Sequence, residues 1–258
     1  MSSHGNPATM QTACNSAPTA IILAAGLGSR LQADRPKGLV EVGPGPVLGR
    51  SLTLLAAAGV AEIVLVGGWK QEVYREYLQR NFPAVRMVSN PDFATTGSLA
   101  SLVIGLRATA GDVLVVESDL LYERRALAAV LAAPGAEVLL ASGYTASGDE
   151  VWVYARDGRL AHLAKTAWTG APRVGELVGL TRLSRPAADG LIAAAATLPA
   201  AAHYEDGLNL LCAARPVSVC LVPDLQWCEI DTADHLRRAR EQVWPRIVDL
   251  DHTAARSP

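Results

Sequence analysis

The sequence predicts an α/β fold in which a mostly parallel sheet is flanked by helices. Three observations lead to this fold class. Short apolar runs alternate with helical patterns of about ten residues through the first 145 residues. A glycine-rich turn follows the first apolar run directly, and an acidic motif follows a later one. Strands of a parallel sheet covered on both faces are expected to be almost continuously apolar, as these runs are.

The first half of the chain supplies the predicted parallel sheet. Strands are expected at Thr19–Ala24, Glu62–Val66, Val85–Ser89, Val113–Ser118 and Glu137–Ser142. Helices are expected at Val47–Ala58, Lys70–Arg80, Ser98–Ala108 and Arg124–Ala132.

The second half has a different rhythm, with more strands. Val151–Ala155 and Leu160–Ala164 flank an Asp-Gly pair, which favours a tight hairpin turn. Further strands are expected at Gly175–Ser184, Val217–Val222 and Trp227–Ile230, and helices at Pro186–Thr197, His203–Ala213 and Asp231–Val243. Because no linker or repeat separates the halves, we predict one domain over residues 18–247. We predict flexible tails over 1–17 and 248–258.

Composition narrows the class of partner. The formal net charge is −2, with 50% hydrophobic and 19% charged residues, so neither nucleic acid nor an anionic membrane is an expected partner. Apolar runs are far shorter than the ~20 residues that cross a bilayer. The four cysteines form no C-x-x-C pair, which favours free thiols over disulfides or zinc. We expect the protein in the cytoplasm.

A turn after the first strand has the features of a phosphate site. Leu23 to Leu31 reads LAAGLGSRL, and small residues there let the backbone approach a ligand closely. The third glycine of a dinucleotide motif is absent, and so is the phosphate-loop pattern. Arg30 and Lys37 follow as two cations suited to a polyphosphate. The alternative is a surface loop with solvated cations.

Carboxylates follow two later strands. Asp119 stands at the carboxyl end of the Val113–Ser118 strand, where ligands bind in open α/β sheets, and is a natural ligand for Mg²⁺. Glu229 and Asp231 alternate about Ile230, so on a strand they share one face. Either aspartate could instead cap the helix that follows it.

One further loop carries groups that could read a base. This loop lies between a predicted strand and helix and contains Asn90, Thr96, Gly97 and Ser98. It combines hydroxyl groups with a glycine that lets the backbone approach a ligand closely. Ser98 could alternatively cap the helix that it opens.

The glycine turn and the following Pro36-Lys37-Gly38-Leu39 resemble the signature L-A-A-G-x-G-[ST]-R-L…P-K-x-L of the nucleotidyltransferase superfamily. The resemblance implies a Rossmann-like sheet of the nucleotide-diphospho-sugar transferase type, with Mg²⁺ on Asp119 and Asp231. It implies that Arg30 and Lys37 hold phosphates. Nucleotide-binding residues would be Leu23, Ala24, Ala25, Gly26, Gly28, Ser29, Asn90, Thr96, Gly97 and Ser98. The Arg30–Pro36 segment is shorter than in typical sugar nucleotidyltransferases, which counts against a sugar-1-phosphate acceptor.

Within that superfamily the chain most resembles phosphonate cytidylyltransferases of the 2-aminoethylphosphonate type, through Glu117-Ser118-Asp119-Leu120, Ser142-Gly143, Gly148-Asp149-Glu150-Val151, Gly175-Glu176-Leu177-Val178-Gly179 and Tyr204-Glu205-Asp206. The likeness covers about Ala20 to Arg240 and implies transfer of CMP from CTP to a small phosphonate, with pyrophosphate released. A lysine equivalent to Lys165 would neutralise the acceptor phosphorus in a small β-rich subregion.

The acceptor itself stays open at this point. A zwitterionic aminophosphonate needs a cation at one end and acids at the other; the available polar groups are Ser142, Asp149, Glu176, Glu205 and Asp206. Phosphocholine or a sugar-1-phosphate is the alternative acceptor, and Trp152, Trp168 and Tyr204 could form a partial cage for a quaternary ammonium. A non-catalytic nucleotide-binding regulatory domain is a further alternative. The sequence does not determine the oligomeric state, and a homodimer is one alternative.

Overall fold

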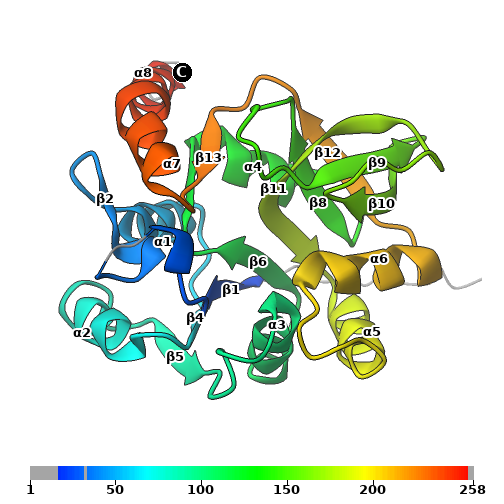
Figure 1. Cartoon of the computed structure of the whole chain (residues 1–258), viewed down its shortest axis with the longest axis horizontal. Coiled ribbons are helices and arrows are strands. Elements are labelled where there is room, and N and C mark those ends of the chain that lie inside the picture. Colours follow the sequence, from blue (N-terminus) through cyan, green and yellow to red (C-terminus); the bar gives the residue numbers. More distant parts are fainter. Residues whose placement is uncertain (1–16, 32–33, 255–258) are drawn as a thin grey trace, which may run out of the picture.

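Strand β1 (Thr19–Ala24) lies inside a nine-stranded sheet, and all six of its residues are buried. Figure 1 shows the computed structural model, which describes residues 17–31 and 34–254. β1 pairs in parallel with β4 (Ile63–Gly67) and with β6 (Val113–Glu117), and β5 (Arg86–Ser89) extends the sheet beyond β4. Side chains alternate between faces, so β1 contributes to the cores on both sides.

The second half of the chain makes the sheet mixed. β11 (Arg173–Leu183) inserts antiparallel between β6 and β8 (Val138–Ser142). β12 (Ser218–Val222) returns parallel to β8, and a hairpin of β9 (Trp152–Arg156) and β10 (Arg159–Ala164) forms the edge. Six strands besides the hairpin run in one direction, so the expected mostly parallel α/β sheet is present with β11 as its antiparallel insertion.

Helices cover both faces of the sheet. α1 (Val47–Ala57), α2 (Gln71–Asn81) and α4 (Arg124–Ala132) bury their apolar sides on one face. α3 (Ser98–Arg107), α5 (Arg185–Ala195) and α6 (Tyr204–Ala214) cover the other. The strands and helices predicted up to residue 142 are confirmed, with ends that differ by no more than one residue.

A small third core joins the two ends of the described chain. β7 (Leu120–Tyr122) pairs antiparallel with β13 (Trp227–Glu229). Beneath the pair lie the short turns η1 (Ser29–Leu31) and η2 (Lys37–Leu39) and the ribbon of β2 (Glu41–Val42) with β3 (Gly45–Pro46). α7 (Ala233–Arg238), the π-helical turn η3 (Ala239–Val243) and α8 (Trp244–Ala254) complete it.

The predicted C-terminal tail is wrong over residues 248–254, which belong to α8. Asp251 accepts hydrogen bonds from the Arg50 guanidinium at 2.7 Å and from the Arg124 amide at 3.0 Å. These contacts attach the helix to α1 and to the start of α4. Of the predicted N-terminal tail, only Ala17 lies among the described residues. The described segments contain no helix that is both long and apolar enough to cross a membrane.

Candidate active site

A cavity of about 400 Å³ opens at the carboxyl ends of β1 and β6. It is lined from one side by the glycine turn and the loop before α3, and from the other by the 145–151 loop and the start of α6. The end of β13 closes a third wall. This is the edge of an open α/β sheet at which ligands are expected.

The glycine turn forms one wall, as predicted. Leu23, Ala24, Ala25 and Gly26 line the cavity. Gly28 does not line it. Its backbone has φ of +61°, and a Cβ there would lie 3.1 Å from Lys37 Cγ, so glycine allows the turn to close over the Lys37 side chain. Ser29 begins η1, and its side chain lies outside what the structure describes.

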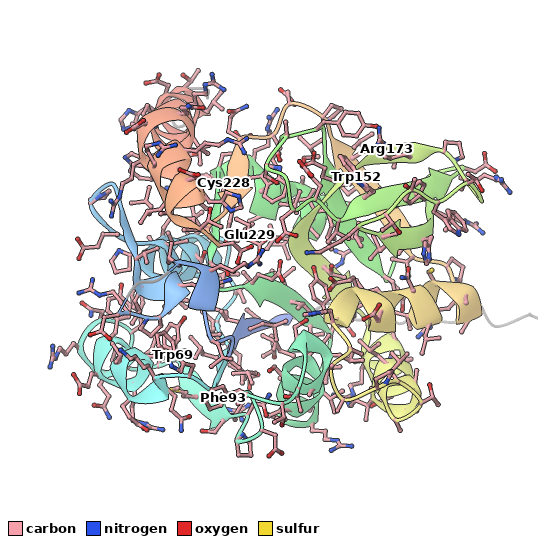
Figure 2. The ribbon with its side chains drawn as sticks, in the orientation of Figure 1. Trp69, Phe93, Trp152, Arg173, Cys228 and Glu229 are labelled. Atoms are coloured by element: carbon pink, nitrogen blue, oxygen red, sulfur yellow. The ribbon has the colours of Figure 1, made fainter. Side chains whose placement is uncertain are left out.

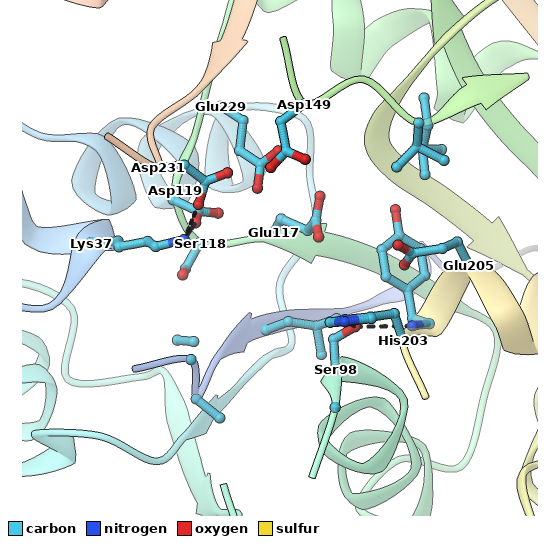
Figure 3. A pocket seen from close by; sticks show the side chains of 18 of the residues that line it. Lys37, Ser98, Glu117, Ser118, Asp119, Asp149, His203, Glu205, Glu229 and Asp231 are labelled. Carbon is cyan, nitrogen blue, oxygen red and sulfur yellow. Dashed lines mark hydrogen bonds and ion pairs between the residues drawn. The ribbon is translucent and has the colours of Figure 1, made fainter. Parts of the chain in front are cut away.

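Lys37 is held between two carboxylates (Figure 3). Its Nζ donates to Asp119 Oδ2 at 3.2 Å and to Asp231 Oδ1. Burial lowers the pKa of Lys37, but the two aspartates outweigh that effect and raise the pKa above its ordinary value. Burial likewise opposes ionisation of Asp231, and Lys37 and Arg30 reverse this to give Asp231 a lowered pKa. The ammonium and the Asp231 carboxylate are therefore both charged at neutral pH.

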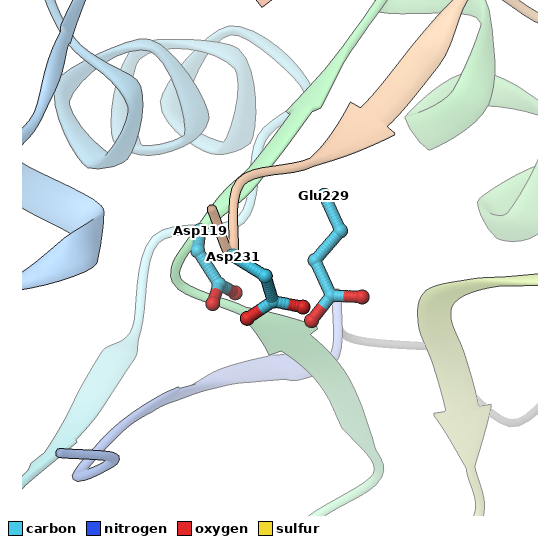
Figure 4. Close-up of side chains that lie close together, drawn as sticks. All are labelled: Asp119, Glu229 and Asp231. Carbon is cyan, nitrogen blue, oxygen red and sulfur yellow. The ribbon is translucent and has the colours of Figure 1, made fainter. Parts of the chain in front are cut away.

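Asp119, Glu229 and Asp231 form a carboxylate triad (Figure 4). Oxygen atoms from the three side chains lie within 4.8 Å of one another. The β7–β13 pairing brings them together, since Leu120 is opposite Glu229 and the Ile230 amide donates to the Asp119 carbonyl at 3.1 Å. Burial and the neighbouring carboxylates raise the pKa of Glu229 well above its usual range.

Neither aspartate caps a helix. Asp119 is followed by strand β7, and α7 is capped by Thr232, whose hydroxyl accepts from the His235 amide at 3.1 Å. Asp231 is only 1% exposed, and its Oδ2 finds no hydrogen-bond donor among the described residues, although Arg30 Nη2 lies 3.1 Å away. An oxygen-rich triad with an unsatisfied buried oxygen fits a divalent cation such as Mg²⁺.

Asp149 connects the remaining two cations. Its carboxylate accepts from Arg30 Nη1 at 2.6 Å and from Lys165 Nζ at 2.6 Å. Burial opposes ionisation of Asp149, but Lys165 and Arg30 lower its pKa. Asp149, which was predicted to contact the acceptor, thus links Arg30 beside the glycine turn to Lys165 after the hairpin.

The predicted base-reading loop lines the cavity only in part. Thr96, Gly97 and Ser98 line it. Asn90 does not, because its buried amide donates to the Thr96 and Ser101 hydroxyls at 3.1 and 3.0 Å and so shapes the loop from behind. Ser98 does not cap α3; its hydroxyl accepts from the Tyr204 amide at 2.9 Å, at the start of α6.

The other predicted acceptor residues divide in the same way. Glu176 and Glu205 line the cavity, whereas Ser142 and Asp206 do not. Glu176 Oε1 accepts from the Thr145 amide at 2.6 Å and so holds the 145–151 loop. Ser142 is buried and accepts from Trp227 Nε1 at 2.7 Å. Asp206 accepts from the His203 amide at 2.8 Å in the capping box of α6.

Glu117 and Tyr74 also line the cavity, and neither was assigned a role from the sequence. Glu117 ends β6 two residues before Asp119, and that position was the available sequence signal. Burial, together with Asp119 and Glu205, raises the pKa of Glu117 well above its usual range. Tyr74 comes from α2, whose apolar periodicity gives no sign of a polar role. Of the cysteines, Cys212, Cys220 and Cys228 are free thiols, and Cys14 lies outside the described residues.

The chain is similar to known nucleotidyltransferases. The model of the MobA-like NTP transferase domain matches residues 20–193. The chain is 39% identical over 128 residues to CMP-5'-(3-aminopropyl)phosphonate synthase of Streptomyces rubellomurinus. This match covers 48% of this chain and 20% of that protein. It is 33% identical over 105 residues to 2-aminoethylphosphonate cytidylyltransferase of Lancefieldella rimae, covering 39% of this chain and 42% of the relative. The chain thus matches less than half the length of either relative.

A solved structure gives the same fold. The CTP:phosphocholine cytidylyltransferase of Streptococcus pneumoniae superposes with a TM-score of 0.69 at 20% sequence identity, covering 86% of this chain and 97% of the other. At that identity the likeness concerns the fold, which is the nucleotide-diphospho-sugar transferase fold expected from the glycine-turn signature. The resemblance to phosphonate cytidylyltransferases is also confirmed by the relatives. The chain belongs to the family of MobA-like NTP transferase domains.

Proposed function

We propose that this protein transfers CMP from CTP to a small phosphonate, with 2-aminoethylphosphonate as the best candidate, and releases pyrophosphate. The observation that carries the proposal is the joint presence of a carboxylate triad and three cationic side chains in one cavity beside the glycine turn. The aminophosphonate relatives support the choice of donor and acceptor.

The three cations and the carboxylate triad each have a role in this reaction. Arg30 and Lys37 bind the CTP phosphates, and Lys165 binds the acceptor phosphonate. Leu23 to Gly26 and Thr96 to Ser98 surround the nucleotide. Asp119, Asp231 and Glu229 would hold Mg²⁺, which would neutralise charge on the triphosphate.

The chemistry requires little from a general base. A phosphonate oxygen is already anionic at neutral pH, so it attacks the α-phosphorus of CTP directly. One phosphorus–oxygen bond forms to the acceptor as the bond to pyrophosphate breaks. The protein contributes by aligning the reactants and by stabilising charge on the transferred group.

Phosphocholine is the acceptor that the geometry supports less well. Of the three aromatic residues that the sequence suggested as a cage for its quaternary ammonium, only Tyr204 lines the cavity. Trp152 instead stacks on Arg173, whose guanidinium lies 4.3 Å from the ring centre (Figure 2). Trp168 packs against Tyr154 and His162. A cation already stacks on Trp152, so the cage is incomplete.

The test is a pyrophosphate-release assay with each NTP, Mg²⁺ and a panel of acceptors. We expect CTP with 2-aminoethylphosphonate to give the highest kcat/KM, above phosphocholine and glucose-1-phosphate. Faster turnover of phosphocholine or a sugar phosphate than of every phosphonate would reject the acceptor. CTP binding without pyrophosphate release from any pair would favour a regulatory domain.

A further inference from the structure

The cavity is more acidic than its reaction requires. Among the described residues, three cationic side chains line it (Arg30, Lys37 and Lys165). Eight carboxylates line it: Glu117, Asp119, Asp149, Glu150, Glu176, Glu205, Glu229 and Asp231. A site for a polyanionic nucleotide and an anionic acceptor has no use for this excess of negative charge unless cations bind with them.

Most of these carboxylates have identified partners. Asp119 and Asp231 bind Lys37, Asp149 binds two cations, and Glu229 completes the triad. Glu176 and Glu150 accept backbone amides at 2.6 and 2.9 Å. Two carboxylates remain. Among the described residues, neither Glu117 nor Glu205 has a cationic side chain within the 4.0 Å of an ion pair. Figure 3 shows Glu205 on the side of the pocket away from Lys37, with Glu117 between them.

The fold makes specific room for Glu117. The register of β11 against β8 shifts between Leu177 and Thr181, and Gly179 within this bulge has φ of +85°. A Cβ at Gly179 would lie 2.4 Å from Glu117 Oε2. The bulge and the missing side chain together create the niche that this carboxylate occupies.

A buried hydroxyl points to a ligand in the same place. Tyr204 is 1% exposed, lines the cavity, and its Oη has no hydrogen-bond partner among the described residues. Burial raises the pKa of this hydroxyl well above its ordinary value, and the charges that raise it most are those of Glu117 and Glu205. Glu205 follows Tyr204 directly at the start of α6, and Glu117, Tyr204 and Glu205 all line the same cavity. A buried polar atom without a partner costs ~1–3 kcal/mol unless something binds it.

We propose that Glu117, Glu205 and Tyr204 bind the primary ammonium group of the acceptor. This inference rests on the proposed function, since it assigns the second end of the acceptor of the same reaction. A primary ammonium has three N–H donors, which match two carboxylates and a hydroxyl oxygen. A quaternary ammonium has none, so the same groups select against it.

The experiment compares two acceptors that share a phosphorus group and differ in the amine: 2-aminoethylphosphonate and ethylphosphonate. We expect the wild-type protein to prefer the aminated acceptor by about 10- to 100-fold in kcat/KM, the range for a charged hydrogen-bonded group. Glu117→Gln and Glu205→Gln should each reduce that preference at least about fivefold, through a higher KM for 2-aminoethylphosphonate. Glu150→Gln, a change of the same chemistry on the same cavity, should retain the preference.

Three results overturn the inference. The first is a wild-type kcat/KM that is nearly equal for the two acceptors. The second is an equal loss of kcat/KM for both acceptors in the variants. The third is a shift of the Mg²⁺ concentration at half-maximal activity in Glu117→Gln while the preference for the aminated acceptor is retained. The last result would assign Glu117 to a second cation. If no acceptor releases pyrophosphate, the proposed transfer has failed, and calorimetric titration of both acceptors into the protein with a non-hydrolysable CTP analogue decides the ammonium site separately. Equal affinities would then reject it.

Discussion

Lys37 and the carboxylate triad place opposite charges in direct contact inside one cavity. We expect Asp119→Asn and Asp231→Asn each to reduce kcat by at least about 10³-fold, because a lost metal carboxylate removes several kcal/mol of transition-state stabilisation. The measurement is pyrophosphate release across a magnesium titration, with Asp234→Asn as control, since Asp234 is an exposed acid paired with Arg237 on α7. Near-wild-type turnover in either triad variant would show that the residue is not a metal ligand.

Removal of Arg30 and removal of Lys37, the two cations nearest the glycine turn, should have similar effects on catalysis and different effects on stability. Arg30→Ala and Lys37→Ala are each expected to lower kcat/KM by about 10²–10³-fold, the usual cost of one preorganised charge contact. Lys37→Ala should also lower the melting temperature, because it leaves the buried Asp231 without its main cation. Arg35→Ala is the control, since Arg35 is an exposed cation that pairs with Glu41. Unchanged kinetics in the Arg30/Lys37 double variant would show that neither residue takes part in catalysis.

At this scale the sequence predicted side chains that lie at strand ends and in the glycine turn. Arg30, Lys37, Asp119 and Asp231 all line the cavity. Ser142 and Asp206 were assigned to the acceptor because of their motifs, but a tryptophan and a helix end use their hydrogen bonds. Whether a side chain bonds to a ligand or to another part of the protein depends on the three-dimensional fold, so no local sequence pattern predicts it.

At the scale of elements, helix α8 was unexpected. No local pattern in the sequence indicates that Asp251 attaches this helix to Arg50 and to the start of α4. We expect Asp251→Ala to lower the free energy of unfolding by about 1–2 kcal/mol, the range for loss of a partly buried charged hydrogen bond. Urea titration measures this, with the exposed neighbour His252→Ala as control. An unchanged midpoint would mean that α8 is held by its apolar contacts alone.

The buried strands and helices of the first half were predictable because their periodicity is continuous over five residues or more. The β7–β13 and β2–β3 pairs were not, since ladders of two or three residues form only where the surrounding core holds them. The insertion of β11 between β6 and β8 was also beyond the sequence, because strand order depends on contacts between distant segments.

For the whole molecule, burial of weak acids predicts instability at high pH. Burial raises the pKa of Tyr74 and Tyr122 from 10.0 to about 12, and that of Cys228 from 9.0 to about 12. Below about pH 8 these groups are protonated in both states, so their contribution to stability is complete. Between about pH 8 and 12 the unfolded chain loses these protons first, and the free energy of unfolding should fall by several kcal/mol in total, to order of magnitude.

Urea unfolding at pH 8, 10 and 11 measures this fall. Tyr122→Phe keeps the ring and removes one titrating hydroxyl, so its loss between pH 10 and 11 should be smaller than that of the wild type. An identical loss in both proteins would contradict the assignment of Tyr122 to this effect.

Lys37 and Asp231 touch although 194 positions separate them along the chain. During synthesis on the ribosome, a nascent chain that ends before Trp227 already contains all nine strands of the large sheet, yet it carries only one of the three triad carboxylates. The predicted magnesium site is therefore completed late in translation, when β13 pairs with β7. In the finished protein, one protease cut in residues 223–226 would leave the nine strands of the large sheet on one fragment, and two of the three triad carboxylates on the other.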